Sequence, residues 1–177
     1  MKKILIIASL VLMGIFGSKN INSTEVIIPK EAIRFRVVAA SNSKEDQENK
    51  IKVRDALQED ITSLLEDSDD VSTTRNLLKN NVNRFEGVVS RTLLENKVDD
   101  LFEVHYGLNY FPEKQYRGVT YEEGYYESLV VTLGAGNGEN WWCVLFPPLC
   151  LLEAEETNTS EVEYKSFVQE LITKYFG

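Results

Sequence analysis

Two cysteines and one histidine are the residues of this sequence that could support nucleophilic catalysis. Cys143 and Cys150 are the only cysteines among 177 residues, and His105 is the only histidine. A cysteine hydrolase needs a thiolate next to a histidine base, so Cys143 and His105 would have to meet from neighbouring strands. Cys143 lies in an apolar run, where burial disfavours the thiolate. The sequence therefore argues against cysteine catalysis, and His105 is more simply an exposed strand residue.

The same cysteines allow two structural interpretations. They are seven positions apart with Pro147 and Pro148 between them, so a disulfide could close a short loop in an exported protein. Two buried free thiols would also pack well in a core. Spacing alone leaves both alternatives open. Structural zinc sites take four ligands of the Cys and His type, so no metal site or cofactor is expected.

Carboxylates offer a second chemistry, because glycoside hydrolysis uses two of them across a sugar bond. The candidates are Glu103, Glu122, Glu123 and Glu127. With 28 Asp and Glu residues in the chain, however, some acids must be neighbours by chance. A cell-wall hydrolase or glycan-binding module remains an alternative function.

The segment 138–150 holds both tryptophans, both cysteines and two of the four prolines. Tryptophan supplies a large, rigid contact area, so this segment predicts a partner-binding surface that is partly exposed. The candidate residues are Asn140, Trp141, Trp142, Phe146, Pro147 and Pro148, with Arg34, Arg36 and Tyr121 as weaker candidates. The sequence thus favours a binding protein over an enzyme.

Arg34 and Arg36 lie on one face of a predicted strand. The ordinary interpretation pairs them with Glu103 and Glu127 on neighbouring strands. The alternative is a recognition patch.

Three alternate glycines, at 134, 136 and 138, superficially resemble a phosphate-binding loop. The lysine and following helix that such a loop needs are missing. The glycines therefore predict a hairpin loop before the last strand.

The N-terminus predicts export. Lys2 and Lys3 precede an uncharged apolar run over residues 4–16, which is shorter than the roughly 20 residues of a membrane-spanning helix. We expect a signal peptide or an uncleaved anchor at 1–20, a linker at 21–31, a domain at 32–152, and an acidic linker with a C-terminal helix at 153–177. The net charge of −9 argues against binding to nucleic acid. Contact with a membrane is expected only through an uncleaved leader.

Hydrophobic periodicity predicts the elements that position these residues. Alternation indicates strands at 33–39, 101–110, 126–133 and 141–146, with a short strand at 116–121. Period-3.6 stripes indicate helices at 44–66, 73–97 and 161–176; Gly87 in the second would mark a bend or a close approach to the sheet. We therefore expect an α+β fold, in which two long helices pack on one face of a mostly antiparallel sheet of about four strands and a C-terminal helix follows.

Several of these segments resemble the stage II sporulation protein R family. They are residues 33–39, 45–47, 50–56, 107–112, 118–121 and 140–150, and they cover most of 33–152. The resemblance implies a signalling protein of endospore formation, made in the forespore and exported into the space between the forespore and mother-cell membranes. It also implies a partner, a membrane-embedded aspartic protease that processes the precursor of sigma-E. It supplies no catalytic residues.

Overall fold

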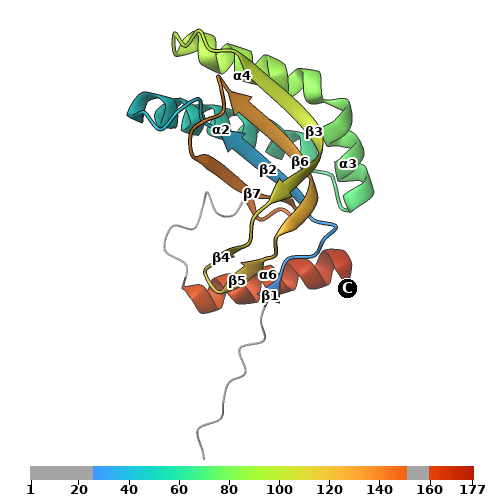
Figure 1. Cartoon of the computed structure of the whole chain (residues 1–177). Coiled ribbons are helices and arrows are strands. Elements are labelled where there is room, and N and C mark those ends of the chain that lie inside the picture. Colours follow the sequence, from blue (N-terminus) through green and yellow to red (C-terminus); the bar gives the residue numbers. More distant parts are fainter. Residues whose placement is uncertain (1–25, 151–159) are drawn as a thin grey trace, which may run out of the picture.

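The computed structural model describes residues 26–150 and 160–177 (Figure 1). The expected leader and residues 153–159 of the expected acidic linker lie outside the described residues. Within the segment expected as a linker, Val26–Ile27 forms a short strand, β1, and the side chains of Val26 and Ile28 are buried.

A four-stranded sheet forms the centre of the fold. It consists of β2 (Ile33–Val38), β3 (Phe102–Phe111), β6 (Gly124–Leu133) and β7 (Asn140–Phe146), in the order β3-β6-β2-β7. β3 pairs antiparallel with β6 and β7 pairs antiparallel with β2, whereas the central β2–β6 pair is parallel. The α+β class is confirmed, with one parallel pair at the centre of the sheet.

Three helices cover one face of this sheet (Figure 1). They are α2 (Lys44–Leu65), α3 (Val71–Asn80) and α4 (Val82–Glu95). Their fully buried side chains join those of the sheet in the main core, among them Leu57, Phe85 and Val89 of the helices and Phe35 and Leu129 of the strands. α2 begins at the predicted cap, where the Ser43 hydroxyl accepts a hydrogen bond from the backbone N–H of Asp46.

The second predicted helix is two helices. The break falls at Asn81, whose side-chain amide donates to the Leu77 carbonyl while its backbone N–H donates to that of Leu78. Asparagine competes in this way for the backbone bonds that would continue a helix. The close approach to the sheet suggested at Gly87 was wrong: Gly87 lies inside α4, and a Cβ there would meet open space.

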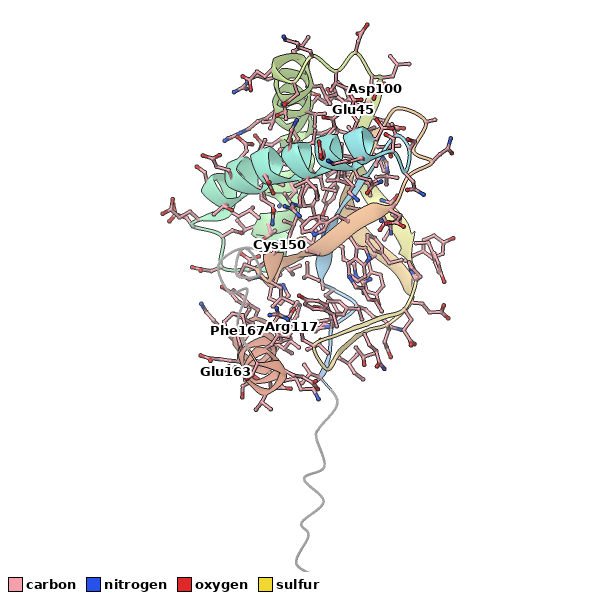
Figure 2. All side chains as sticks on the ribbon, turned by 90° about the vertical axis from the view of Figure 1, so that its left-hand side faces the viewer. Glu45, Asp100, Arg117, Cys150, Glu163 and Phe167 are labelled. Carbon is pink, nitrogen blue, oxygen red and sulfur yellow. A yellow bond between two sulfur atoms is a disulfide. The ribbon has the colours of Figure 1, made fainter. Side chains whose placement is uncertain are left out.

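A second, smaller sheet lies beside the first. It has the order β1-β5-β4, from β1, β5 (Val119–Tyr121) and β4 (Lys114–Tyr116). The C-terminal helix α6 (Glu161–Phe176) packs against it, with Tyr164 and Val168 in a separate apolar cluster. Arg117 of the β4–β5 turn lies near the N-terminal end of α6, 5.6 Å from the centroid of the Tyr164 ring (Figure 2).

The glycine-rich loop joins β6 to β7, but it does not form the hairpin that was predicted. β2 lies between these two strands, so the loop must pass over the end of β2. There the N–H of Asn137 donates to the Ala40 carbonyl and that of Gly138 to the Ala39 carbonyl. A Cβ on Gly138 would collide with the backbone carbonyl of Ser41. Glycine is therefore required by a close approach between backbones.

A pair of glycine substitutions tests this crossing. Gly138→Ala should destabilise the protein by about 2 kcal/mol or more, because the backbone of Ser41 or the loop must move. Gly87→Ala is the matched control and should stabilise it by about 0.5–1 kcal/mol, since alanine is the better helix former. Urea unfolding followed by circular dichroism measures both; equal midpoints for the two variants would contradict the crossing.

Candidate functional site

The structure does not assemble the candidate cysteine–histidine pair. Cys143 is on β7 and His105 on β3, which are the opposite edges of the sheet, about 14 Å apart at ~4.8 Å per strand. The neighbouring-strand placement that a cysteine–histidine pair would need is therefore not met. Cys143 is also bonded to Cys150, so it has no thiol.

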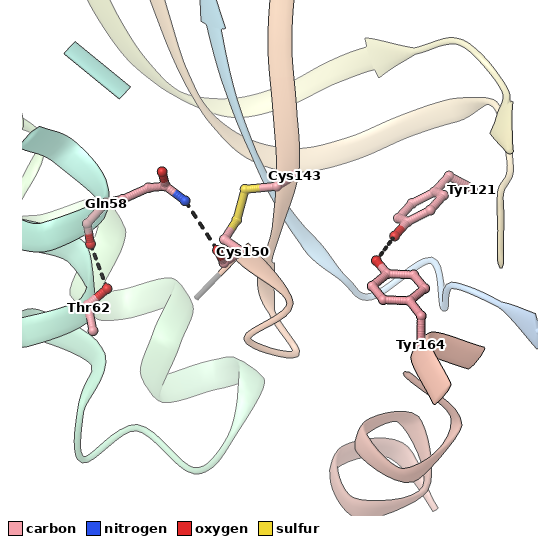
Figure 3. The surroundings of a disulfide bond; sticks show 6 residues. All are labelled: Gln58, Thr62, Tyr121, Cys143, Cys150 and Tyr164. Carbon is pink, nitrogen blue, oxygen red and sulfur yellow. Dashed lines mark hydrogen bonds between the residues drawn. A yellow bond between two sulfur atoms is a disulfide. The ribbon is translucent and has the colours of Figure 1, made fainter. Parts of the chain in front are cut away.

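The disulfide decides between the two alternatives left open by the sequence. The Cα atoms of Cys143 and Cys150 are 5.4 Å apart, and both residues are buried. The Gln58 side chain of α2 donates a hydrogen bond of 3.2 Å to the Cys150 carbonyl (Figure 3). The bridge and this hydrogen bond hold the proline loop at the end of β7 against α2.

Two of the candidate carboxylates, Glu103 and Glu127, lie on opposite faces of the sheet. Glu103 of β3 lies opposite Thr132 of β6, so these two side chains share one face. Glu127 is five residues from Thr132 on β6, and side chains alternate along a strand. Glu103 and Glu127 therefore point to opposite faces of the sheet. Glu127 forms an ion pair of 2.6 Å with Arg75 of α3, and Glu123 accepts a hydrogen bond from the Tyr110 hydroxyl. Within 26–150 and 160–177, no group of three or more His, Cys, Asp or Glu residues could hold a metal ion.

Arg34 does not make the expected pair with an acid. Its side chain is fully buried, and the guanidinium carbon lies 3.5 Å from the centroid of the Tyr126 ring, 4.9 Å from that of Phe111 and 5.0 Å from that of Trp142. Its Nη2 donates to the Glu122 carbonyl at 3.3 Å. Burial lowers the pKa of Arg34 to about 10, so the group is still a cation at neutral pH and is stabilised by the ring faces.

Arg36 continues this cluster toward solvent. It is half-buried, its guanidinium carbon lies 3.8 Å from the centroid of the Phe111 ring, and it donates to the Tyr110 carbonyl at 2.7 Å. Desolvation lowers its pKa. We call Arg34, Arg36, Phe111, Tyr126 and Trp142 the arginine–aromatic stack. Its outer members, Arg36 and Trp142, lie opposite each other on paired strands.

The two tryptophans point to opposite faces of β7. Trp141 contacts the main core, edge-on to Phe35, and Arg54 of α2 lies 5.1 Å from its ring centroid. Trp142 packs edge-on against Phe111 and Tyr121. Both tryptophans are partly exposed.

The other candidate residues divide into support and surface. Arg34, Tyr121, Phe146 and Pro147 are buried and support the exposed residues from below. Of these four, Tyr121 also lines the pocket beside the tryptophans. Phe146 packs against Tyr175 of α6. Asn140 is exposed and Pro148 is partly exposed. Within the segment 141–150, which was expected to be partly exposed, only the two tryptophans and Pro148 are partly exposed.

A pocket of about 260 Å³ opens beside the tryptophans. It is lined by Trp141, Trp142 and Cys143 of β7 and by Lys114, Tyr116 and Tyr121 of the β4–β5 hairpin. The Lys114 ammonium lies 5.0 Å from the Trp142 ring centroid and 5.5 Å from that of Tyr116. Sequence reasoning missed Lys114 and Tyr116; their only signal was the alternation of a three-residue strand.

Comparison with known proteins agrees with the resemblance. The family model described as stage II sporulation protein R matches residues 29–156. The chain belongs to the stage II sporulation protein R family. It is 34% identical over 153 residues to stage II sporulation protein R of Bacillus subtilis (strain 168), covering 85% of this chain and 68% of that protein. No solved structure matches it.

The disulfide should contribute measurably to stability. Replacing both Cys143 and Cys150 by alanine should lower the free energy of unfolding by about 2 kcal/mol, the chain-entropy value for so short a loop. Reductant should produce a similar loss in the unmodified chain and none in the double variant. Unchanged unfolding midpoints in both comparisons would contradict this role.

Two substitutions at Arg34 separate packing from charge. Arg34→Ala leaves a cavity among the rings and should cost about 3–5 kcal/mol. Arg34→Met retains the volume and removes a buried charge, so it should cost only about 1 kcal/mol. Guanidinium unfolding measures both. A methionine variant as unstable as the alanine variant would show that the cation itself holds the stack.

Proposed function

We propose that this protein acts as an exported signal in endospore formation, which binds a membrane-embedded aspartic protease and activates it to process the precursor of sigma-E. Membership of the stage II sporulation protein R family supports the sporulation role. The structural observation that carries the proposal is the rigid, partly exposed pair Trp142 and Arg36 on the arginine–aromatic stack.

A signal of this kind must bind the active state of the protease better than the inactive state. Reversing a 1:99 equilibrium takes about 5.5 kcal/mol of differential affinity. Interface hot spots contribute about 2–4 kcal/mol each and are enriched in tryptophan and arginine. Two or three anchors on this surface are enough to supply that difference.

Preorganisation strengthens such an interaction. Binding costs roughly 0.5–1.5 kcal/mol for each flexible side chain that it orders. Trp142 is already held between Phe111, Tyr121 and Arg34. Little of that cost falls on this tryptophan when a partner docks.

The proposed location is the space between the forespore and mother-cell membranes, reached through the leader expected at 1–20. In the described part of the chain, no helix has both the length and the apolar character to cross a bilayer. The partner must therefore be reached either by the domain alone or by a domain tethered through that leader.

Substitution of the surface tests the proposal directly. Trp142→Ala and Arg36→Ala should each reduce processing of the sigma-E precursor about 30-fold or more at limiting signal, which corresponds to a hot-spot loss of about 2 kcal/mol. Leu94→Ala is the control, because Leu94 is a large apolar residue on α4 that is 72% exposed and lies outside this surface. Processing is measured by immunoblot in cells that export each variant.

Export and folding are verified for every variant before processing is compared. Trp142→Phe serves as a second variant that retains an aromatic ring and should recover part of the activity. Normal processing by folded, exported Trp142→Ala and Arg36→Ala would overturn the proposal for this surface. Release of sugar products from cell wall by the purified domain would instead support the hydrolase alternative.

A further inference from the structure

We infer that the outer edge of β7 binds an extended segment of its protein partner as an added β-strand, with a large apolar side chain of that segment in the Trp142 pocket and an acidic side chain next to Lys114. This inference deepens the proposed function, on which it rests, because it specifies how the partner is recognised. Strand addition draws affinity from main-chain hydrogen bonds and specificity from alternate side chains.

β7 has an unpaired edge within the described residues. It is the last strand of the four-stranded sheet, and its pairing there is with β2 (Figure 1). The Glu139 carbonyl accepts from the Ala39 N–H of the β2 side. Because backbone groups alternate in direction along an extended strand, the N–H and C=O groups of Asn140 and Trp142 point away from β2. These are the groups that an added strand would pair with.

The pocket lies along this edge. Trp141 and Cys143 belong to one face of β7 and Trp142 to the other, yet all three line the same pocket together with the β4–β5 hairpin. We take this shared lining, together with the position of β7 at the edge of its sheet, to place the pocket along that edge. Its volume of about 260 Å³ is below the range of about 300–1,000 Å³ for small-molecule sites. It therefore suits one large side chain of a bound segment.

The positive charge beside the pocket favours a partner segment that carries a carboxylate. The whole chain has a net charge of −9, but Lys114 lines this pocket. Arg36 lies opposite Trp142 on the paired strand, and Arg54 lies 5.1 Å from the Trp141 ring centroid. Among the described residues, the salt bridge of Arg54 is with Asp55, whereas Lys114 and Arg36 form none. A partner segment with a carboxylate two residues from its apolar anchor would place both on one face of the strand, about 7 Å apart.

Designed peptides test strand addition on the intact exported domain. The probe is a seven-residue peptide of alternating valine and threonine, with a central phenylalanine and a glutamate two positions away. Its binding is followed by tryptophan fluorescence, since both tryptophans of the chain are at this site. N-methylation of alternate amides blocks strand pairing without changing the side chains, so it should weaken binding at least 10-fold.

Charge reversal adds a readout that a folding defect cannot imitate. Lys114→Glu should weaken the glutamate peptide at least 10-fold and strengthen a peptide carrying lysine in its place. Asn140→Pro removes an outward N–H at the first residue of a strand, where proline is tolerated, and should weaken binding at least 10-fold. Asn140→Ala retains the N–H and should bind within about 2-fold of the unmodified chain.

The outcomes distinguish this inference from the proposed function. If the N-methylated peptide binds as well as its parent, or no peptide binds saturably at millimolar concentration, strand addition is wrong, even where Trp142→Ala abolishes precursor processing. If the peptides bind as expected but Lys114→Glu and Asn140→Pro signal normally, the edge binds strands and the signalling role of this surface is wrong. Saturable binding of a muropeptide mixture that displaces the peptide would assign the pocket to a glycan and overturn the inference.

Discussion

The burial of one arginine organises this fold. Arg34 is enclosed by the rings of Tyr126, Phe111 and Trp142, which come from three different strands. A cation removed from water is costly unless other groups replace its hydration. Here the ring faces and the Glu122 carbonyl replace part of it, while Nε and Nη1 have no hydrogen-bond partner among the described residues. The same contacts fix the orientation of Trp142. The geometry of the exposed surface therefore depends on how the buried Arg34 is packed.

The position of β2 explains why that surface is at an edge. Because β2 lies between β6 and β7, the last strand is displaced to the outside of the sheet and the glycine-rich loop crosses above β2. One face of β7 then joins the main core through Cys143 and Leu145, and the other joins the smaller cluster through Val144. The strand is apolar on both sides for this reason. Its outer edge, unpaired within residues 26–150 and 160–177, lies beside the junction of the two cores.

Local patterns predicted the elements well, since alternation and 3.6-residue periodicity depend on each residue's own neighbours. The bounds of α6 and the cap of α2 at Ser43 are as expected. Pairing between distant segments was less predictable: the parallel β2–β6 pair and the wide separation of His105 from Cys143 depend on strand order, which periodicity does not encode. For the site, the tryptophans were found from their rarity, whereas Lys114 was missed because its contact with Trp142 is made only in the folded chain. The expected pairing of Arg34 with Glu103 and Glu127 failed because ring faces were not considered as partners for a cation.

An exposed strand edge is a hazard, because another edge can pair with it. Two copies of this chain that met through β7 would form a two-fold interface, in which the same surface of each copy contacts the other. Such pairing would gather Lys114 and Arg36 of both copies around one interface, where like charges repel each other. The net charge of −9 adds repulsion between whole molecules. If β7 binds an acidic segment as inferred above, the same cations that attract that segment would also disfavour pairing with a second copy.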